Sequence, residues 1–192
     1  MHRGILPVSQ PVAKTRERYL ANELAAGALL VHPTEGVYGI GCDAWNEWAL
    51  RRLIAAKGRA ADKGLIVLVA AIHHLAGLVV PQDAARVPAP DDIPTTWIVR
   101  ACSSAPPLVT GGRSTVAVRI CGHVRMMALL NEFGGAMVSS SANRAGAAPA
   151  RTALQARVRF AGAVDAVMGG STSGYGRPSR IIELATGRVL RW

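Results

Sequence analysis

The stretch 57-KGRAADKGLIVLVA-70 places the cations Lys57, Arg59 and Lys63 directly before a run of large apolar side chains. Apolar residues at helical spacing precede the stretch, and Gly58 is a residue type that ends helices. The continuous run Leu65–Val69 is typical of a strand that is buried on both faces. We therefore predict a helix end, a cationic loop and a buried strand. The charges of such a loop serve either solubility or the binding of an anion.

Helical and strand patterns alternate along the rest of the chain. Helical spacing is found over residues 16–26, 46–57, 72–78, 124–133 and 153–160, and strand-like runs over residues 28–31, 96–101, 115–120 and 136–139. Residues 180–184 and 188–192 flank Ala185-Thr186-Gly187 and predict a terminal hairpin. Residues 32–44 are rich in turn residues, and the Pro- and Asp-rich residues 81–94 predict a mobile loop. We expect an extended arm over residues 1–13 and one α/β domain over residues 14–192, built as a twisted sheet of parallel and antiparallel strands flanked by helices.

The composition favours a polyanionic partner. The chain has 22 Lys and Arg against 12 Asp and Glu, which gives a net charge of +10 over 192 residues. No apolar run approaches the ~20 residues that span a bilayer, and the N-terminus lacks the apolar segment of a signal peptide. The three cysteines are widely spaced and lack metal-ligand spacing. We therefore expect a cytoplasmic protein without a membrane contact or a protein-bound metal.

The strand 114-STVAVRI-120 carries an arginine in an apolar sequence. Because side chains alternate between faces, Thr115, Ala117 and Arg119 share one face of the strand. An arginine is costly to bury unless a carboxylate or a phosphate meets it. Arg119 therefore indicates either an ion pair with an internal Asp or Glu or an anion-binding site, and the sequence leaves both interpretations open.

The stretch 136-AMVSSSANRAGAAP-149 places Ser139, Ser141 and Asn143 on one side of a strand that gives way to a turn. Such hydroxyl and amide groups can bind phosphate oxygens or the polar groups of an amino acid. A cluster of serines that caps or forms a turn is the alternative.

Other nucleotide-binding and catalytic motifs are not supported. Residues 39–44 match GxGxxA, but the match does not follow a strand directly, as a dinucleotide-binding fingerprint requires. The sequence contains no GxxxxGK[ST] motif and no set of residues that indicates a Ser/His/Asp triad. Lys, Arg, Ser, Thr and Asn are poor general bases but bind anions well, which points to phosphoryl or nucleotidyl transfer.

Five stretches in order resemble the YrdC/TsaC family of threonylcarbamoyl-AMP synthases. They are HPTEGVYGIGCDA, KGRAADKGLIVL, STVAVRI, MVSSSANRAG and PSRIIELATGRVLRW, and they span nearly the whole chain after residue 14. The DKGLI form and the end near residue 192 are similar to the short, single-domain bacterial version. The resemblance implies the YrdC-like sheet with a basic concave surface.

The resemblance also implies a nucleotidyltransferase that forms L-threonylcarbamoyladenylate and pyrophosphate from L-threonine, bicarbonate and ATP, with Mg²⁺ accompanying ATP. The product serves N6-threonylcarbamoyladenosine (t6A) modification at position 37 of tRNAs that read ANN codons. A downstream tRNA threonylcarbamoyl-transferase complex is the implied partner. The alternative is a YrdC-like module that binds RNA, to which Arg151, Arg157 and Arg159 would contribute, without synthase activity.

Individual residues match functional positions of the family. The resemblance implies ATP binding by Lys57, Arg59, Lys63, Thr115, Ser141, Asn143, Pro149 and Arg191, and threonine binding by Thr34, Arg119, Ser139 and Ser179. Lys57, Arg59 and Arg119 are the implied catalytic residues. The chain departs from the family pattern at Asp91-Asp92-Ile93, where a Trp-Pro-Gly segment is usual, so two carboxylates stand where they would weaken ATP binding if they faced the phosphates.

Overall fold

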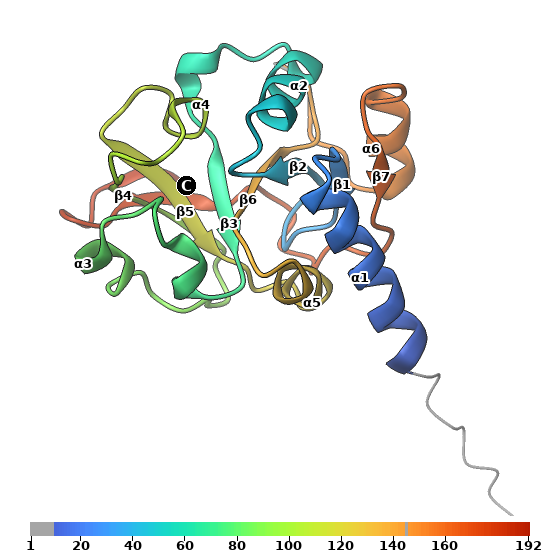
Figure 1. Ribbon diagram of the computed structural model, residues 1–192, viewed down its shortest axis with the longest axis horizontal. Coiled ribbons are helices and arrows are strands. Elements are labelled where there is room, and N and C mark those ends of the chain that lie inside the picture. Colours follow the sequence, from blue (N-terminus) through green and yellow to red (C-terminus); the bar gives the residue numbers. More distant parts are fainter. Residues whose placement is uncertain (1–9, 145) are drawn as a thin grey trace, which may run out of the picture.

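The computed structural model describes residues 10–144 and 146–192, and within them one sheet runs in the strand order β7-β1-β2-β6-β3-β5-β4-β8-β9 (Figure 1). Its strands are β1 (Leu30–His32), β2 (Gly39–Asp43), β3 (Ile66–Val69), β4 (Thr95–Arg100), β5 (Thr115–Ile120), β6 (Met137–Ser141), β7 (Ala166–Val167), β8 (Arg180–Glu183) and β9 (Val189–Arg191). The pairs β1–β7, β3–β5 and β4–β8 are parallel and the other neighbours are antiparallel. The predicted mixed sheet is thus confirmed.

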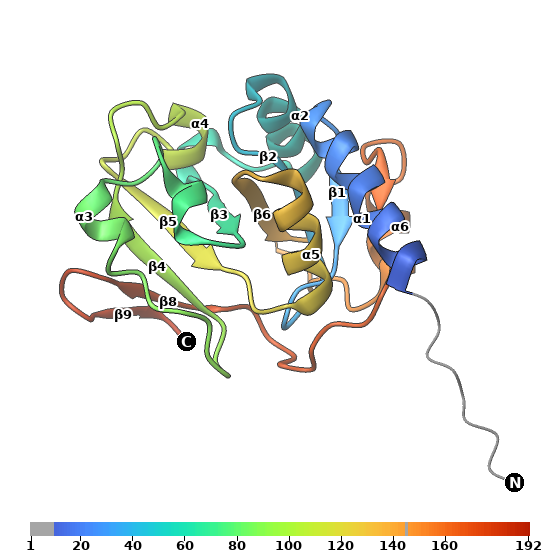
Figure 2. The same ribbon diagram turned by 60° about the horizontal axis from the view of Figure 1, so that its bottom comes forward.

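Helices cover both faces of this sheet. They are α1 (Gln10–Ala25), α2 (Glu47–Lys57), α3 (Pro81–Ala84), α4 (Pro107–Thr110), α5 (Val124–Phe133) and α6 (Ala153–Arg159), with 3₁₀ turns η1 (Ala61–Lys63) and η2 (Ile72–Leu75). Helices α1 and α5 lie side by side in Figures 1 and 2. Their apolar residues, such as Leu24 and Leu130, pack with Met137 in one core, and a second core joins α2 and α6 to the opposite face of the sheet.

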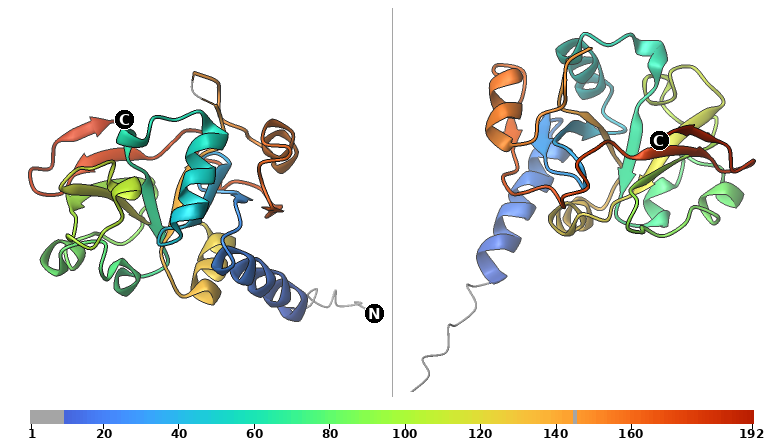
Figure 3. Two further views of the ribbon diagram at one scale, coloured as in Figure 1. Left: turned by 45° about the horizontal axis from the view of Figure 1, so that its top comes forward. Right: turned by 180° about the vertical axis from the view of Figure 1, so that it is seen from behind.

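One face of the sheet is covered along part of its length and open along the rest. On β3, Leu68 packs under α1 and α5, whereas Ile66, two residues earlier on the same face, lines an open cavity. The same holds along β5 and the residue after it, where Cys121 packs in the core under α1 and α5 and Arg119 lines the cavity. Figure 3 shows the hairpin β8–β9 at the edge of the sheet opposite α6. Because α1 and α5 cover only part of this sheet face, its other end is free to form a site.

Helix α1 begins at Gln10, six residues before the predicted start, so residues 10–13 of the predicted arm are helical, and residues 1–9 lie outside the described residues. Residues 39–43 form a strand although a turn was predicted, because Gly39 and Gly41 fit a close approach of β6. Of the predicted α-helix 72–78, residues 72–75 form the 3₁₀ turn η2 instead, and α3 lies within the predicted loop 81–94. Strand β7 and helix α4 were not predicted. With two residues in β7 and four in α4, both elements are too short to give a periodic sequence pattern.

Among residues 10–144 and 146–192, no helix is both long enough and apolar enough to cross a membrane. Cys42, Cys102 and Cys121 are free thiols.

Candidate active site

A cavity of about 430 Å³ occupies the open end of the sheet face. This volume falls within the range of small-molecule sites, about 300–1,000 Å³. The cavity brings together nine of the twelve predicted site residues, which are Thr34, Arg59, Lys63, Thr115, Arg119, Ser139, Ser141, Ser179 and Arg191. The sheet order explains this convergence, because β6, β3 and β5 are neighbours and β8–β9 turns back beside them.

The lining of the cavity is strongly cationic. Arg59, Lys63, Arg113, Arg119 and Arg191 line it, whereas none of its described lining residues is Asp or Glu. Burial and the neighbouring Arg113 charge hold the pKa of Arg59 below its ordinary value, and burial with the Arg119 charge does the same for Arg191. Neighbouring cations disfavour one another's charged form, and an anion that binds between them offsets this repulsion. The cavity is therefore suited to a polyanionic ligand.

The loop between α2 and β3 sets the position of two of these cations. Asn46 caps α2, and Gly58 ends it in the left-handed conformation, as the sequence predicted. The Arg59 guanidinium then donates to the carbonyl oxygens of Lys63 and Gly64, at 3.1 and 2.8 Å. The side chain thereby closes the loop on itself and brings Arg59 and Lys63 to the cavity wall.

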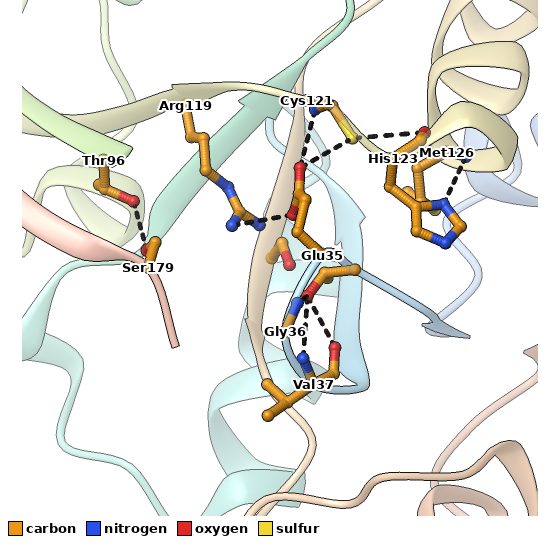
Figure 4. A network of polar contacts seen from close by, with 12 residues as sticks. Glu35, Gly36, Val37, Thr96, Arg119, Cys121, His123, Met126 and Ser179 are labelled. Atoms are coloured by element: carbon orange, nitrogen blue, oxygen red, sulfur yellow. Dashed lines mark hydrogen bonds and ion pairs between the residues drawn. The ribbon is translucent and has the colours of Figure 1, made fainter. Parts of the chain in front are cut away.

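Arg119 forms a buried ion pair at the floor of the cavity. Its Nη1 lies 3.1 Å from Oε2 of Glu35, and Figure 4 shows the two side chains facing each other. Gly122 N–H donates to Oε1 of Glu35 at 2.7 Å. Burial opposes the charge of Glu35, yet the Arg119 guanidinium and backbone N–H groups hold its pKa below the ordinary value. Arg119 Nε has no hydrogen-bond partner although it is buried, so the guanidinium keeps donor capacity for a ligand. The structure thus confirms the ion pair that was one interpretation of Arg119, and anion binding by Arg119 stays a prediction that the unpartnered Nε supports.

Several hydroxyl groups of the lining form hydrogen bonds with neighbouring residues. Thr34 Oγ1 donates to the Val37 carbonyl oxygen at 2.7 Å and so closes the loop between β1 and β2. Ser179 Oγ lies 2.8 Å from Thr96 Oγ1, and Figure 4 shows the two side chains facing each other. Ser141 Oγ donates to Asn143 Oδ1 at 2.6 Å. These bonds fix the hydroxyl oxygens at the cavity wall.

Ser139 has a histidine partner. Its Oγ lies 3.2 Å from Nε2 of His32, a residue with no exposed surface at the end of β1. Nδ1 of the same ring lies 3.1 Å from the Pro33 carbonyl oxygen. Burial lowers the pKa of His32 to about 4, so the ring is neutral at physiological pH.

Three predicted site residues do not line the cavity. Lys57 is 5% exposed and its Nζ donates to the carbonyl oxygens of Ser141 and Asn143, the latter at 2.8 Å. Burial lowers the pKa of Lys57 to about 8. Asn143 Nδ2 donates to the Ala147 carbonyl oxygen at 2.9 Å, and Pro149 is half-buried in the same segment. Lys57 and Asn143 thus hold the turn that carries Ser141.

Sequence reasoning missed Arg113, Glu35 and His32. Arg113 stands two residues before Thr115 and could have been found as a cation at the start of the same strand. Glu35 and His32 gave no local signal, because their partners Arg119 and Ser139 are distant in sequence.

The two carboxylates that depart from the family pattern lie away from the cavity lining. Asp91 Oδ2 is 3.6 Å from Nη2 of Arg180, and its Oδ1 accepts from Ile93 N–H at 3.1 Å. Neither Asp91 nor Asp92 belongs to the residues that line the cavity. The structure therefore gives no sign of the electrostatic conflict with ATP that the sequence raised.

The chain is similar in sequence to known proteins over most of its length. The sequence profile of the Sua5/YciO/YrdC family, described as "Telomere recombination", matches residues 22–192. The chain is 44% identical over 171 residues to a threonylcarbamoyl-AMP synthase of Thiobacillus denitrificans, covering 88% of this chain and 90% of the relative. It is 40% identical over 179 residues to that of Halorhodospira halophila, covering 92% and 94%.

Solved structures share the fold. P. abyssi Sua5 complexed with L-threonine superposes with a TM-score of 0.81 at 30% identity, over 92% of this chain and 53% of that protein. The chain therefore spans about half the length of this structural relative. E. coli YciO superposes with a TM-score of 0.76 over 93% of this chain and 89% of its own, and at 20% identity it supports the fold alone.

Proposed function

This chain belongs to the Sua5/YciO/YrdC family, and we propose that it is a threonylcarbamoyl-AMP synthase, a nucleotidyltransferase of tRNA processing. It forms L-threonylcarbamoyladenylate and pyrophosphate from L-threonine, bicarbonate and ATP in the cytoplasm. The observation that carries the proposal is the cavity that combines a buried, partly unpartnered arginine with a cationic rim. Such a cavity has room and charge for one carboxylate and one triphosphate.

In the proposed arrangement the two substrates take opposite ends of the cavity. Arg119 binds the threonine carboxylate through donors that Glu35 leaves free, and Thr34, Ser139 and Ser179 surround the amino acid. The ATP phosphates meet Arg59, Lys63 and Arg113, while Thr115, Ser141 and Arg191 contact the nucleotide. Lys57 and Asn143 support the nucleotide end from behind the cavity wall through the turn at Ser141. Pro149, predicted at the nucleotide, follows this turn in sequence.

The chemistry proceeds by positioning and charge stabilisation. The threonine amine adds to CO₂ derived from bicarbonate and loses a proton, which gives a carbamate. A carbamate oxygen then attacks the α-phosphorus of ATP, and the bond to pyrophosphate breaks. Guanidinium and ammonium groups around the phosphates stabilise the charge that develops on the equatorial and leaving oxygens.

Mg²⁺ does not fit the lining residues as ligands. Mg²⁺ prefers carboxylate and water oxygens, whereas the described lining offers cations and hydroxyl groups, and no group of three potential metal ligands occurs in the described residues. We propose that Mg²⁺ arrives with ATP, bound to its phosphate oxygens.

The proposal is tested by pyrophosphate release from ATP, with threonine and bicarbonate omitted in turn. We expect release when all three substrates are present and a loss to background when either is omitted. Release that does not depend on threonine would sink the assignment.

The product requires a downstream tRNA threonylcarbamoyl-transferase complex for t6A modification. Direct RNA binding is a second candidate, because Arg151 and Arg157 are exposed on and beside α6. Such binding falls steeply as the salt concentration rises and does not require threonine, which separates it from synthase activity.

A further inference from the structure

The His32 side chain crosses β2 to reach Ser139, a residue of the cavity lining. On the sheet, His32 of β1 is paired with Gly39 of β2, and Gly39 is paired with Ser141 of β6. A Cβ atom at Gly39 would lie 2.7 Å from Cε1 and 2.9 Å from Nε2 of the imidazole, and 3.0 Å from Ser139 Oγ. Because glycine has no Cβ atom, the imidazole and the Ser139 hydroxyl can meet across β2 at Gly39.

The two contacts of the imidazole fix the position of its proton. The Pro33 carbonyl oxygen can accept a hydrogen bond but cannot donate one, so Nδ1 must carry the hydrogen of the 3.1 Å contact. In a neutral ring Nε2 is then an acceptor. The hydrogen of the 3.2 Å contact between Nε2 and Ser139 Oγ therefore comes from the serine.

This assignment determines what Ser139 offers to the cavity. A hydroxyl group has one hydrogen and two lone pairs, and Ser139 gives its hydrogen to His32. Its lone pairs remain for the cavity, which Ser139 lines. Since the cations of the lining are donors, Ser139 supplies an acceptor in a site dominated by donors.

We propose that His32 is a positioning residue that makes Ser139 a hydrogen-bond acceptor for a donor group of the amino-acid substrate. This inference rests on the proposed function, because it takes an amino acid as the ligand at this end of the cavity. An α-amino acid offers the matching chemistry, with a carboxylate for Arg119 and an ammonium or hydroxyl donor for Ser139. A carboxylate or phosphate at Ser139 is disfavoured, since the committed hydroxyl hydrogen is not free to bind it.

The test is a double-mutant cycle read by calorimetric titration of L-threonine. We expect His32→Phe and Ser139→Ala each to weaken threonine binding about tenfold, the scale of one hydrogen bond to a charged group. In the Ser139→Ala background His32→Phe should change the affinity less than about twofold, because the contact is already lost. His32→Gln, whose side-chain oxygen can accept from Ser139, should recover most of the affinity. A nucleotide analogue should bind all variants alike.

Two results would overturn the proposal. One is a His32→Phe effect that is the same with and without the Ser139 hydroxyl. The other is an equal loss of threonine and nucleotide affinity, which would mark His32 as a general structural residue. L-2-aminobutyrate, which lacks the hydroxyl group of threonine, identifies the donor. An unchanged His32→Phe effect assigns the ammonium, and a vanished effect assigns the hydroxyl.

A measurement on the unaltered protein does not depend on how the variants fold. Two-bond ¹⁵N–¹H spectra distinguish the two neutral tautomers of a histidine, and we expect His32 to carry its hydrogen on Nδ1. A hydrogen on Nε2 would contradict the proposal. Failure of the proposed function is a different result, in which the wild-type protein binds no threonine and forms no product.

Discussion

Replacing Glu35 by Gln removes the carboxylate that faces the Arg119 guanidinium at 3.1 Å. The side chains of Arg119 and Glu35 are only 8% and 10% exposed, so the remaining cation would be left largely without water. Removing one member of a buried ion pair costs about 3–5 kcal/mol. The Gln side-chain oxygen can still accept from Gly122 N–H, as Glu35 does at 2.7 Å, so we expect the lower end, about 3 kcal/mol.

The assay is urea and thermal unfolding followed by circular dichroism. A loss of about 3 kcal/mol in a domain of this size lowers the Tm by about 6–12 °C. Glu47→Gln is the matched control, because Glu47 pairs with Arg51 at 2.6 Å and both side chains are about two-thirds exposed, at 68% and 66%. An exposed pair of this kind contributes about 0.5 kcal/mol or less. Equal effects of Glu35→Gln and Glu47→Gln would refute the reasoning about the buried pair.

The stability contributed by the Glu35–Arg119 ion pair should also depend on pH. The pKa of Glu35 is held below its ordinary value in the folded protein, so the unfolded chain takes up this proton first as the pH falls. The stability from the ion pair is therefore complete above the ordinary pKa of Glu, about 4.3, and is lost below it. We expect the stability difference between wild type and Glu35→Gln to shrink as the pH falls through this range.

Three further predictions concern the substrates. Arg119→Ala should weaken threonine binding about 10- to 100-fold in calorimetric titration, because a charge-assisted hydrogen bond is lost, and unchanged affinity in a folded variant would remove Arg119 from the site. Lys57→Met should lower the affinity for an ATP analogue about tenfold by releasing the turn that carries Ser141, whereas Arg51→Met on the exposed side of α2 should not. Asp91→Asn should leave ATP affinity unchanged, because Asp91 faces Arg180, and tighter binding would show that the loop closes over the phosphates.

Local sequence periodicity was sufficient to predict which residues of β5 share the face that lines the cavity. Side chains alternate along any strand, so Thr115 and Arg119 had to share a face once the strand was recognised. The structure places both in the cavity wall. The end of α2 could likewise be predicted from one residue, Gly58, because the left-handed C-cap favours glycine. These parts of the site follow from neighbours in sequence.

The partners of those side chains do not follow from local patterns. Ser139 and His32 are 107 positions apart, and their contact exists because β2 pairs with β1 on one side and β6 on the other. The two glycines of β2 weaken any strand pattern, which is why residues 39–43 were predicted as a turn. The strand order that brings Glu35 to Arg119 is likewise a property of the whole sheet.

The most direct test of the account follows the atoms of the product. The protein is incubated with ATP, L-threonine and ¹³C-labelled bicarbonate, and the nucleotides are identified by mass spectrometry. We predict an adenylate that contains both threonine and one ¹³C atom, formed together with pyrophosphate. If threonine and ATP both bind but no ¹³C-labelled adenylate forms, the result would contradict the proposed synthase activity.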